Sequence, residues 1–184
     1  MSGKTGDDSD YTKMEGNAKV VTDSMEIEAD LIELKGEDFR YIVATGNIKG
    51  KNTKSKLDFT CDKLTYDKET KNVTLENTVH LLDIENEVTA DAQYIEYNQD
   101  TEIAIMQISV YLTQKKNICT SAYAVYKKKE QILEMSGNPK VVQDEDTFRA
   151  QTITLNLETY DPESGATASD PGRSEGVAGE GWGG

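Results

Sequence analysis

Two aspartates are the first residues in this chain that could do chemistry. Asp30 and Asp62 each follow a small residue and lie two positions before an apolar one. Glycosidases use a pair of such carboxylates, one as acid and the other as nucleophile or base. Both residues, however, occupy the same place in a repeated motif, which is typical of a structural strand or turn residue. We therefore expect a structural role for both.

The cysteines and the histidine add little chemistry. The chain has two cysteines, Cys61 and Cys119, and one histidine, His80, too few for a zinc cluster. The repeat places the cysteines two rungs apart, and two rungs at about 4.8 Å each give roughly 10 Å, which is too far for a disulfide. We expect buried free thiols and a solvated histidine on the outer face of a strand.

Lys127, Lys128 and Lys129 form a short basic cluster on a predicted turn. We expect a solvated turn, with contact to a phosphorylated headgroup as the alternative. The sequence has no nucleophile motif, phosphate-binding glycine loop or calcium-binding loop. We therefore expect neither catalysis nor a cofactor.

The strongest pattern is a six-residue motif that occurs five times. Its first position is small, its second usually polar, its fourth usually branched and apolar, and its sixth Leu or Tyr. The copies begin at Ala29, Cys61, Ala92, Ser121 and Ala150, which gives spacings of 32, 31, 29 and 29 along the chain. A near-constant period of this length marks a repeat architecture, in which each unit buries its apolar face by stacking on its neighbours.

Each unit predicts two antiparallel strands joined by a turn. Apolar residues alternate with polar ones on both sides of a polar tetrad, and these tetrads lie at 67–70, 98–101 and 127–130. The step from the first to the fourth motif position breaks the alternation, which predicts a bulge. The sequence thus predicts an all-β, open β-jelly-roll or solenoid of about five stacked antiparallel strand pairs, without substantial helix.

In three of the units, the middle of the second strand carries a pair of residues that predicts a kink. The pair is Gly46-Asn47 in one unit and Gly137-Asn138 in another, with an extra copy at Gly16-Asn17. In the unit that begins at Cys61, the equivalent pair is Glu76-Asn77. Glycine inside a strand pattern indicates a kink or bulge.

Composition limits the classes of partner. A formal charge of -14 and a pI near 4.5 argue against nucleic acid and against docking by charge on an anionic membrane. The chain has no apolar run long enough for a membrane-spanning helix. Its first residues have no apolar signal region, so either the protein is cytosolic or a targeting segment has been removed.

Three segments are predicted along the chain. Residues 1–13 are expected to be a disordered leader, residues 14–159 the β-domain, and residues 160–184 a flexible Gly/Ser-rich tail. Trp182, the only tryptophan, falls in the tail. It is either incidental or a docking residue.

Residues 14–159 resemble the OstA-like family of lipopolysaccharide-transport proteins. The resemblance rests on Cys61–Asp67 (CDKLTYD), Met25–Ile32 (MEIEADLI), Gly46–Ile48 (GNI) and Gly137–Pro139 (GNP). It implies a periplasmic protein whose targeting segment has been removed, with an open V-shaped jelly-roll that binds acyl chains of lipopolysaccharide or a related glycolipid. It also implies end-to-end assembly through terminal strand edges, with further copies and with inner-membrane LptC-like and outer-membrane LptD-like proteins. Within the family, the bridge type is favoured over the anchored type and the type that continues into a barrel.

The apolar ladders are the candidate ligand site. Acyl chains need a long apolar groove, since burying each methylene contributes about 0.8 kcal/mol. Two flexible methionines at equivalent positions also suit a binding surface that can repack. The predicted lipid-binding lumen residues are Ile27, Ile32, Phe59, Leu64, Leu75, Ile95, Met106, Val110, Leu112, Met135, Phe148 and Ile153.

An alternative function uses the same fold without a ligand. A structural or adaptor β-solenoid would polymerise end to end around a core filled by its own side chains. Both interpretations predict exposed terminal strand edges that pair by strand addition. They differ only in whether the interior admits lipid.

Overall fold

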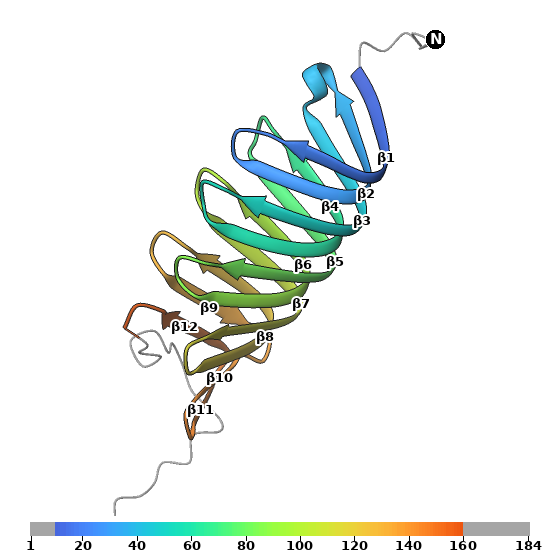
Figure 1. Ribbon diagram of the computed structural model, residues 1–184. Helices are drawn as coiled ribbons and strands as arrows, with labels where there is room; N and C mark the ends of the chain where they lie inside the picture. The colour runs from blue at the N-terminus through green and yellow to red at the C-terminus, as the bar shows by residue number, and fades with distance from the viewer. Residues whose placement is uncertain (1–9, 160–184) are drawn as a thin grey trace, which may run out of the picture.

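The computed structural model describes residues 10–159, which form one twelve-stranded antiparallel sheet. Figure 1 shows the bent strands nested one behind another along the axis of the stack. The strands are β1 (Asp10–Val21), β2 (Met25–Gly36), β3 (Tyr41–Asn52), β4 (Leu57–Asp67), β5 (Asn72–Asp83), β6 (Val88–Asn98), β7 (Ile103–Gln114), β8 (Asn117–Lys127), β9 (Ile132–Ser136), β10 (Lys140–Gln143), β11 (Asp146–Arg149) and β12 (Thr152–Asn156).

Each strand pairs with the next along the chain until the sheet divides after β8. One half of β8 pairs with β9 and the other half with β10. The division continues outward, because β12 pairs with β9 and β11 pairs with β10. Strands β9 and β10 therefore correspond to one bent strand, as do β11 and β12. The predicted all-β stack of five strand pairs is confirmed.

Every long strand bends near its middle, where the sheet folds into two layers. The pairing register shifts there, as between Glu28 and Leu31 of β2, which confirms the predicted bulge. Gly46 and Asn47 both have positive φ, 83° and 47°. In β5 the equivalent residues are Asn77 and Thr78, with φ of 64° and 50°. The assignment of this bend to Glu76-Asn77 was wrong by one residue, because no glycine marks it.

The bend explains the aspartate of the motif. The Asn47 side-chain amide donates to Asp30 Oδ2 at 2.8 Å. A Cβ at Gly46 would lie 2.6 Å from the same oxygen, so this close approach requires glycine. Asp62 occupies the equivalent bulge of β4, where it is exposed. The structural interpretation of Asp30 is confirmed.

The core lies between the two layers. Alternate side chains of both layers point inward and form one apolar cluster, while the outer faces carry mainly charged and polar residues, as alternation in a strand requires. Among the described residues, one 3₁₀ turn, η1 (Glu37–Phe39), lies between β2 and β3. Over residues 10–159, no helix is long and apolar enough to cross a membrane.

The N-terminal boundary differs from the prediction. Strand β1 begins at Asp10, so residues 10–13, assigned to the disordered leader, pair instead with β2. The exposed, mostly polar side chains of this edge strand hid its strand character. The remainder of the predicted leader, the predicted tail and Trp182 lie outside the described residues.

Candidate functional site

The predicted lumen residues converge on the interior between the layers. Eleven of the twelve are buried. The other, Phe148 of β11, is partly buried and packs against the core at the end of the stack. The most enclosed of them have no exposed surface: Ile27, Ile32, Leu64, Ile95, Met106 and Leu112.

Strand register aligns these residues in two rows, one on each layer. The first ladder lies on one side of the bend and consists of Met14, Ile32, Ala44, Leu64, Leu75, Ile95, Met106, Ala124, Met135 and Ile153. The second ladder lies on the other side and consists of Val20, Ile27, Gly50, Phe59, Leu81, Ala90, Leu112, Cys119, Val141 and Phe148. No polar or charged side chain interrupts either ladder. Val110 lies outside both, beside the bend of β7.

The interior is closed in this structure. Apart from Met14, Val20 and Phe148, which are partly buried at the ends of the stack, the side chains of the two ladders belong to one core cluster and have almost no exposed surface. Phe59 fills the gap opposite Gly50, where a Cβ would lie 2.0 Å from the ring. A chain-like ligand could therefore enter only if the layers part.

The layers meet at their open side in a line of polar contacts, which we call the seam. Turns such as 98–102, between β6 and β7, lie along the edge of one layer. Turns such as 52–56, between β3 and β4, lie along the edge of the opposite layer. Tyr97 donates its hydroxyl hydrogen to Ser55 Oγ at 2.8 Å, across the seam. Tyr66 donates to Gln99 Oε1 at 2.9 Å, and Ser24 donates to the same oxygen at 3.3 Å. Burial raises the pKa of Tyr97 above its ordinary value.

The third tyrosine of the seam joins an ion-pair network. Tyr126 donates to Asp83 Oδ2 at 2.8 Å. Lys128 Nζ lies 2.8 Å from Glu85 Oε2 and 3.6 Å from Asp83 Oδ1. Burial, together with the charge of Asp83, raises the pKa of Tyr126. Burial alone would lower the pKa of Lys128, but its hydrogen bond with Glu85 and the charge of Asp83 raise it.

The lysine cluster therefore differs from the prediction of a solvated turn. The Lys128 side chain is only 5% exposed and its charge is balanced across the seam, since a buried ammonium requires a partner. Lys127 pairs with Glu134 at 2.7 Å, and Lys129 donates to the Asp100 carbonyl at 2.8 Å. Only knowledge of the opposite layer could have revealed the role of Lys128.

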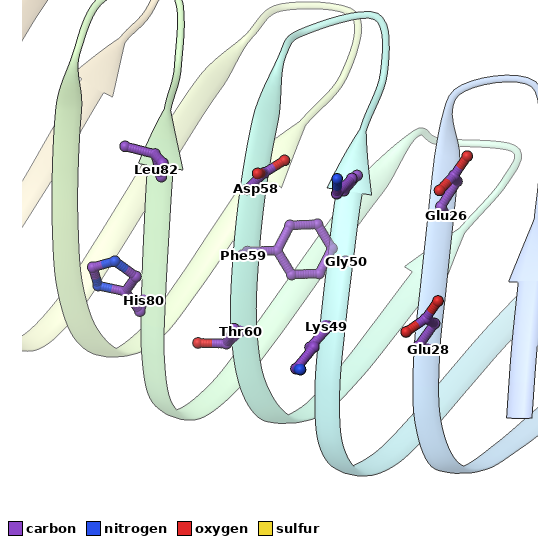
Figure 2. A pocket seen from close by; sticks show the side chains of 10 residues that line it. Glu26, Glu28, Lys49, Gly50, Asp58, Phe59, Thr60, His80 and Leu82 are labelled. Carbon is purple, nitrogen blue, oxygen red and sulfur yellow. The ribbon is translucent and has the colours of Figure 1, made fainter. Parts of the chain in front are cut away.

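A hollow lies on the outer face of β2–β5 and has a volume of about 430 Å³. Figure 2 shows the Phe59 ring extending from β4 to Gly50 on β3, with charged side chains around it. Its rim mixes acids such as Glu28 with bases such as Lys49, which lie opposite each other in the register of β2 and β3. His80 stands at its edge with Nδ1 2.7 Å from Asp91 Oδ1. The expected outward position of His80 is confirmed.

The cysteines are as predicted. Cys61 and Cys119 are free and buried, and burial raises the pKa of each thiol to about 12. Within residues 10–159, no group of three or more histidine, cysteine, aspartate or glutamate side chains could hold a metal ion.

The seam tyrosines are functional candidates that the sequence reasoning missed. Their type was visible, because the sixth motif position is Tyr66, Tyr97 and Tyr126 in the middle copies. A second signal was the polar series Asn52, Asp83 and Gln114, which recurs at a constant spacing close to the period of the motif. Nothing in the sequence shows that the tyrosine series and the polar series face each other across the layers.

Comparison with known proteins agrees with this architecture. A model of the family described as LptA/(LptD N-terminal domain) LPS transport protein matches residues 3–132. LptH, the LptA-homologous periplasmic component of the lipopolysaccharide transport device of Pseudomonas aeruginosa, has a similar structure with a TM-score of 0.55 at 13% identity. The match covers 64% of this chain and 90% of LptH. No curated protein matches the sequence. The family match spans well over half of the chain, which therefore belongs to the LptA/LptD N-terminal domain family of lipopolysaccharide transport proteins.

Proposed function

We propose that this protein is a periplasmic, non-catalytic carrier that holds the acyl chains of lipopolysaccharide or a related glycolipid between its two layers. The observation that carries the proposal is the pair of facing apolar ladders, which continue through the stack without a polar interruption. Family membership supports the lipopolysaccharide class of ligand.

Binding requires the layers to part along the seam. An acyl chain of a dozen carbons would gain roughly 10 kcal/mol by leaving water, at about 0.8 kcal/mol for each methylene. Part of this gain offsets the loss of contacts between the ladders. The polar groups of the seam would meet the headgroup or water when separated, whereas the ladders would stay in contact with hydrocarbon.

Transfer between membranes is proposed to use the two ends of the sheet. Within the described residues, β1 pairs only with β2, β11 only with β10, and β12 only with β9. Each end thus presents backbone groups suited to strand addition. The proposed partners are further copies of the chain and LptC-like and LptD-like proteins, which would extend the ladders into one apolar path.

A structural solenoid without ligand is the second candidate. The near-zero exposure of residues such as Ile32 and Ile95 favours it, because the interior is already filled by its own side chains. The two candidates make opposite predictions for lipid binding.

Native mass spectrometry with purified lipopolysaccharide tests the proposal. A carrier forms a complex with intact lipopolysaccharide and none with the chemically deacylated molecule, because the acyl chains supply the binding energy. Multimers that grow with protein concentration support end-to-end assembly. Folded protein that stays ligand-free at saturating lipopolysaccharide supports the structural solenoid.

A further inference from the structure

The seam follows a regular pattern that fails at one place. The seam tyrosines belong to a third row of paired residues, Leu34, Ile42, Tyr66, Val73, Tyr97, Ala104, Tyr126, Leu133 and Leu155. From β4 to β8, tyrosine occupies every second strand, and Leu155 of β12 stands where the fourth tyrosine would follow.

Each tyrosine is directed at one particular turn. Tyr97 of β6 bonds the turn between β3 and β4, and Tyr126 of β8 bonds the turn between β5 and β6. Tyr66 of β4 is joined through Gln99 to Ser24, in the turn between β1 and β2. The same step, continued to β12, would direct the side chain at position 155 towards the turn between β7 and β8, which Gln114 and Asn117 flank. Leucine has no hydroxyl to offer that turn.

Two polar side chains that flank this turn, Gln114 and Asn117, are buried, and most of their polar atoms lack hydrogen-bond partners. Gln114 is 3% exposed and Asn117 is 1% exposed. Gln114 Nε2 donates to the Asn86 carbonyl at 3.1 Å, but Gln114 Oε1 has no hydrogen bond, and neither has Asn117 Oδ1 or Nδ2. Elsewhere along the described seam, single atoms are unpaired, Asn52 Nδ2 and Gln99 Nε2. Three unpaired atoms at the β7–β8 turn, which no tyrosine of the row reaches, indicate that something else supplies the missing partners.

We propose that Gln114 and Asn117 form the polar subsite for the acylated glycolipid, at the point where acyl chains join the sugar. This inference rests on the proposed function. Gln114 Oε1 requires a donor, whereas Asn117 offers both a donor and an acceptor. An acyl linkage supplies a carbonyl oxygen that can accept a hydrogen bond, and neighbouring hydroxyl or amide groups of the ligand supply donors. These ligand groups lie close together, as do two residues joined by a tight turn.

The position also suits entry of the ligand. No tyrosine reaches this turn, and Leu133 and Leu155, at the end of the tyrosine row, are fully buried register partners. Acyl chains bound between the ladders would therefore have their polar ends at this part of the seam.

Substitutions of Leu155 and Asn117 test the subsite. Leu155→Tyr restores the missing hydroxyl, so the chain itself satisfies the turn, whereas Leu155→Phe adds the same ring without the hydroxyl. Asn117→Leu removes the side-chain amide that would bond the ligand and keeps a similar side-chain volume. Ser121→Ala is the matched control, because Ser121 Oγ is also buried and unpartnered but lies near the bend of β8.

The measurements are the affinities for purified lipopolysaccharide and for cis-parinaric acid, a fluorescent fatty acid without the acylated sugar. Leu155→Tyr is expected to bind lipopolysaccharide about tenfold more weakly than Leu155→Phe, and Asn117→Leu about tenfold more weakly than wild type, which corresponds to one or two lost hydrogen bonds. Ser121→Ala should bind like wild type. Parinaric acid affinity should change by less than about twofold in Asn117→Leu.

The outcomes separate the subsite from the proposed function. Wild type that binds lipopolysaccharide, with Asn117→Leu and Leu155→Tyr binding equally well, overturns the subsite alone. Wild type that fails to bind overturns the proposed function and the subsite with it. Urea unfolding establishes that each variant is folded, and Asn117→Leu tests the subsite without any change to the core at Leu155.

Discussion

The hydroxyl of Tyr126 should contribute about 2 kcal/mol to the stability of the fold. It donates to Asp83 Oδ2 at 2.8 Å and accepts from Asn86 Nδ2 at 3.2 Å. Hydrogen bonds to charged groups contribute about 1.5–3 kcal/mol. Asp83 keeps other partners in Tyr126→Phe, including Lys128 at 3.6 Å, so the carboxylate is not left alone. We therefore expect Tyr126→Phe to lower the free energy of unfolding by about 2 kcal/mol, in the lower half of that range.

Urea unfolding followed by circular dichroism measures this loss. Tyr126→Phe should lower the free energy of unfolding by about 2 kcal/mol and the melting temperature by about 6 °C. Tyr123→Phe is the control, because Tyr123 is 39% exposed, and its expected change is below about 0.5 kcal/mol. Equal, small losses in both variants would refute the claim that tyrosines fasten the two layers.

Two further predictions concern the bends and the thiols. Gly46→Ala should destabilise the protein by at least about 1 kcal/mol more than Gly16→Ala, as measured by urea unfolding. Both glycines have positive φ, but only at Gly46 would a Cβ meet Asp30 Oδ2. Equal losses of stability in the two variants would contradict this. The native thiols of Cys61 and Cys119 should resist iodoacetamide at pH 8 and react fully in urea, and native labelling at the unfolded rate would oppose the burial described. Each thiol has a folded pKa of about 12, above the unfolded value of about 8.5. The contribution of the thiols to stability is therefore complete below about pH 8.5 and is lost as the pH rises towards 12. The double alanine variant should consequently show a shallower fall in the free energy of unfolding over that interval.

The repeat alone was sufficient to predict most of the fold. The apolar positions that recur with the period of the motif had to share one side of the stack, and Ile32, Leu64 and Ile95 do lie in one ladder. Glycine marked the bends at Gly46 and Gly137 because left-handed backbone favours it.

Features that depend on the opposite layer could not be predicted. The bend at Ile108-Ser109 has positive φ at both residues, 66° and 54°, although neither residue type favours it. It is imposed by the neighbouring strands of the stack. Lys128 had the sequence of a solvated turn, and only the fold places it beside Asp83, which lies far earlier in the chain. The unpaired groups of Gln114 and Asn117 likewise become visible only once Leu155 is placed across the seam.

Site-specific photocrosslinking tests most directly whether acyl chains lie between the ladders. A small diazirine side chain is introduced at Met106, which is fully buried in the first ladder, or at Gln107, the next residue, which is exposed on the outer face. After incubation with lipopolysaccharide and illumination, a lipid adduct is predicted at position 106 and none at position 107. Adducts of equal yield at both positions, or at position 107 alone, would contradict an interior binding site.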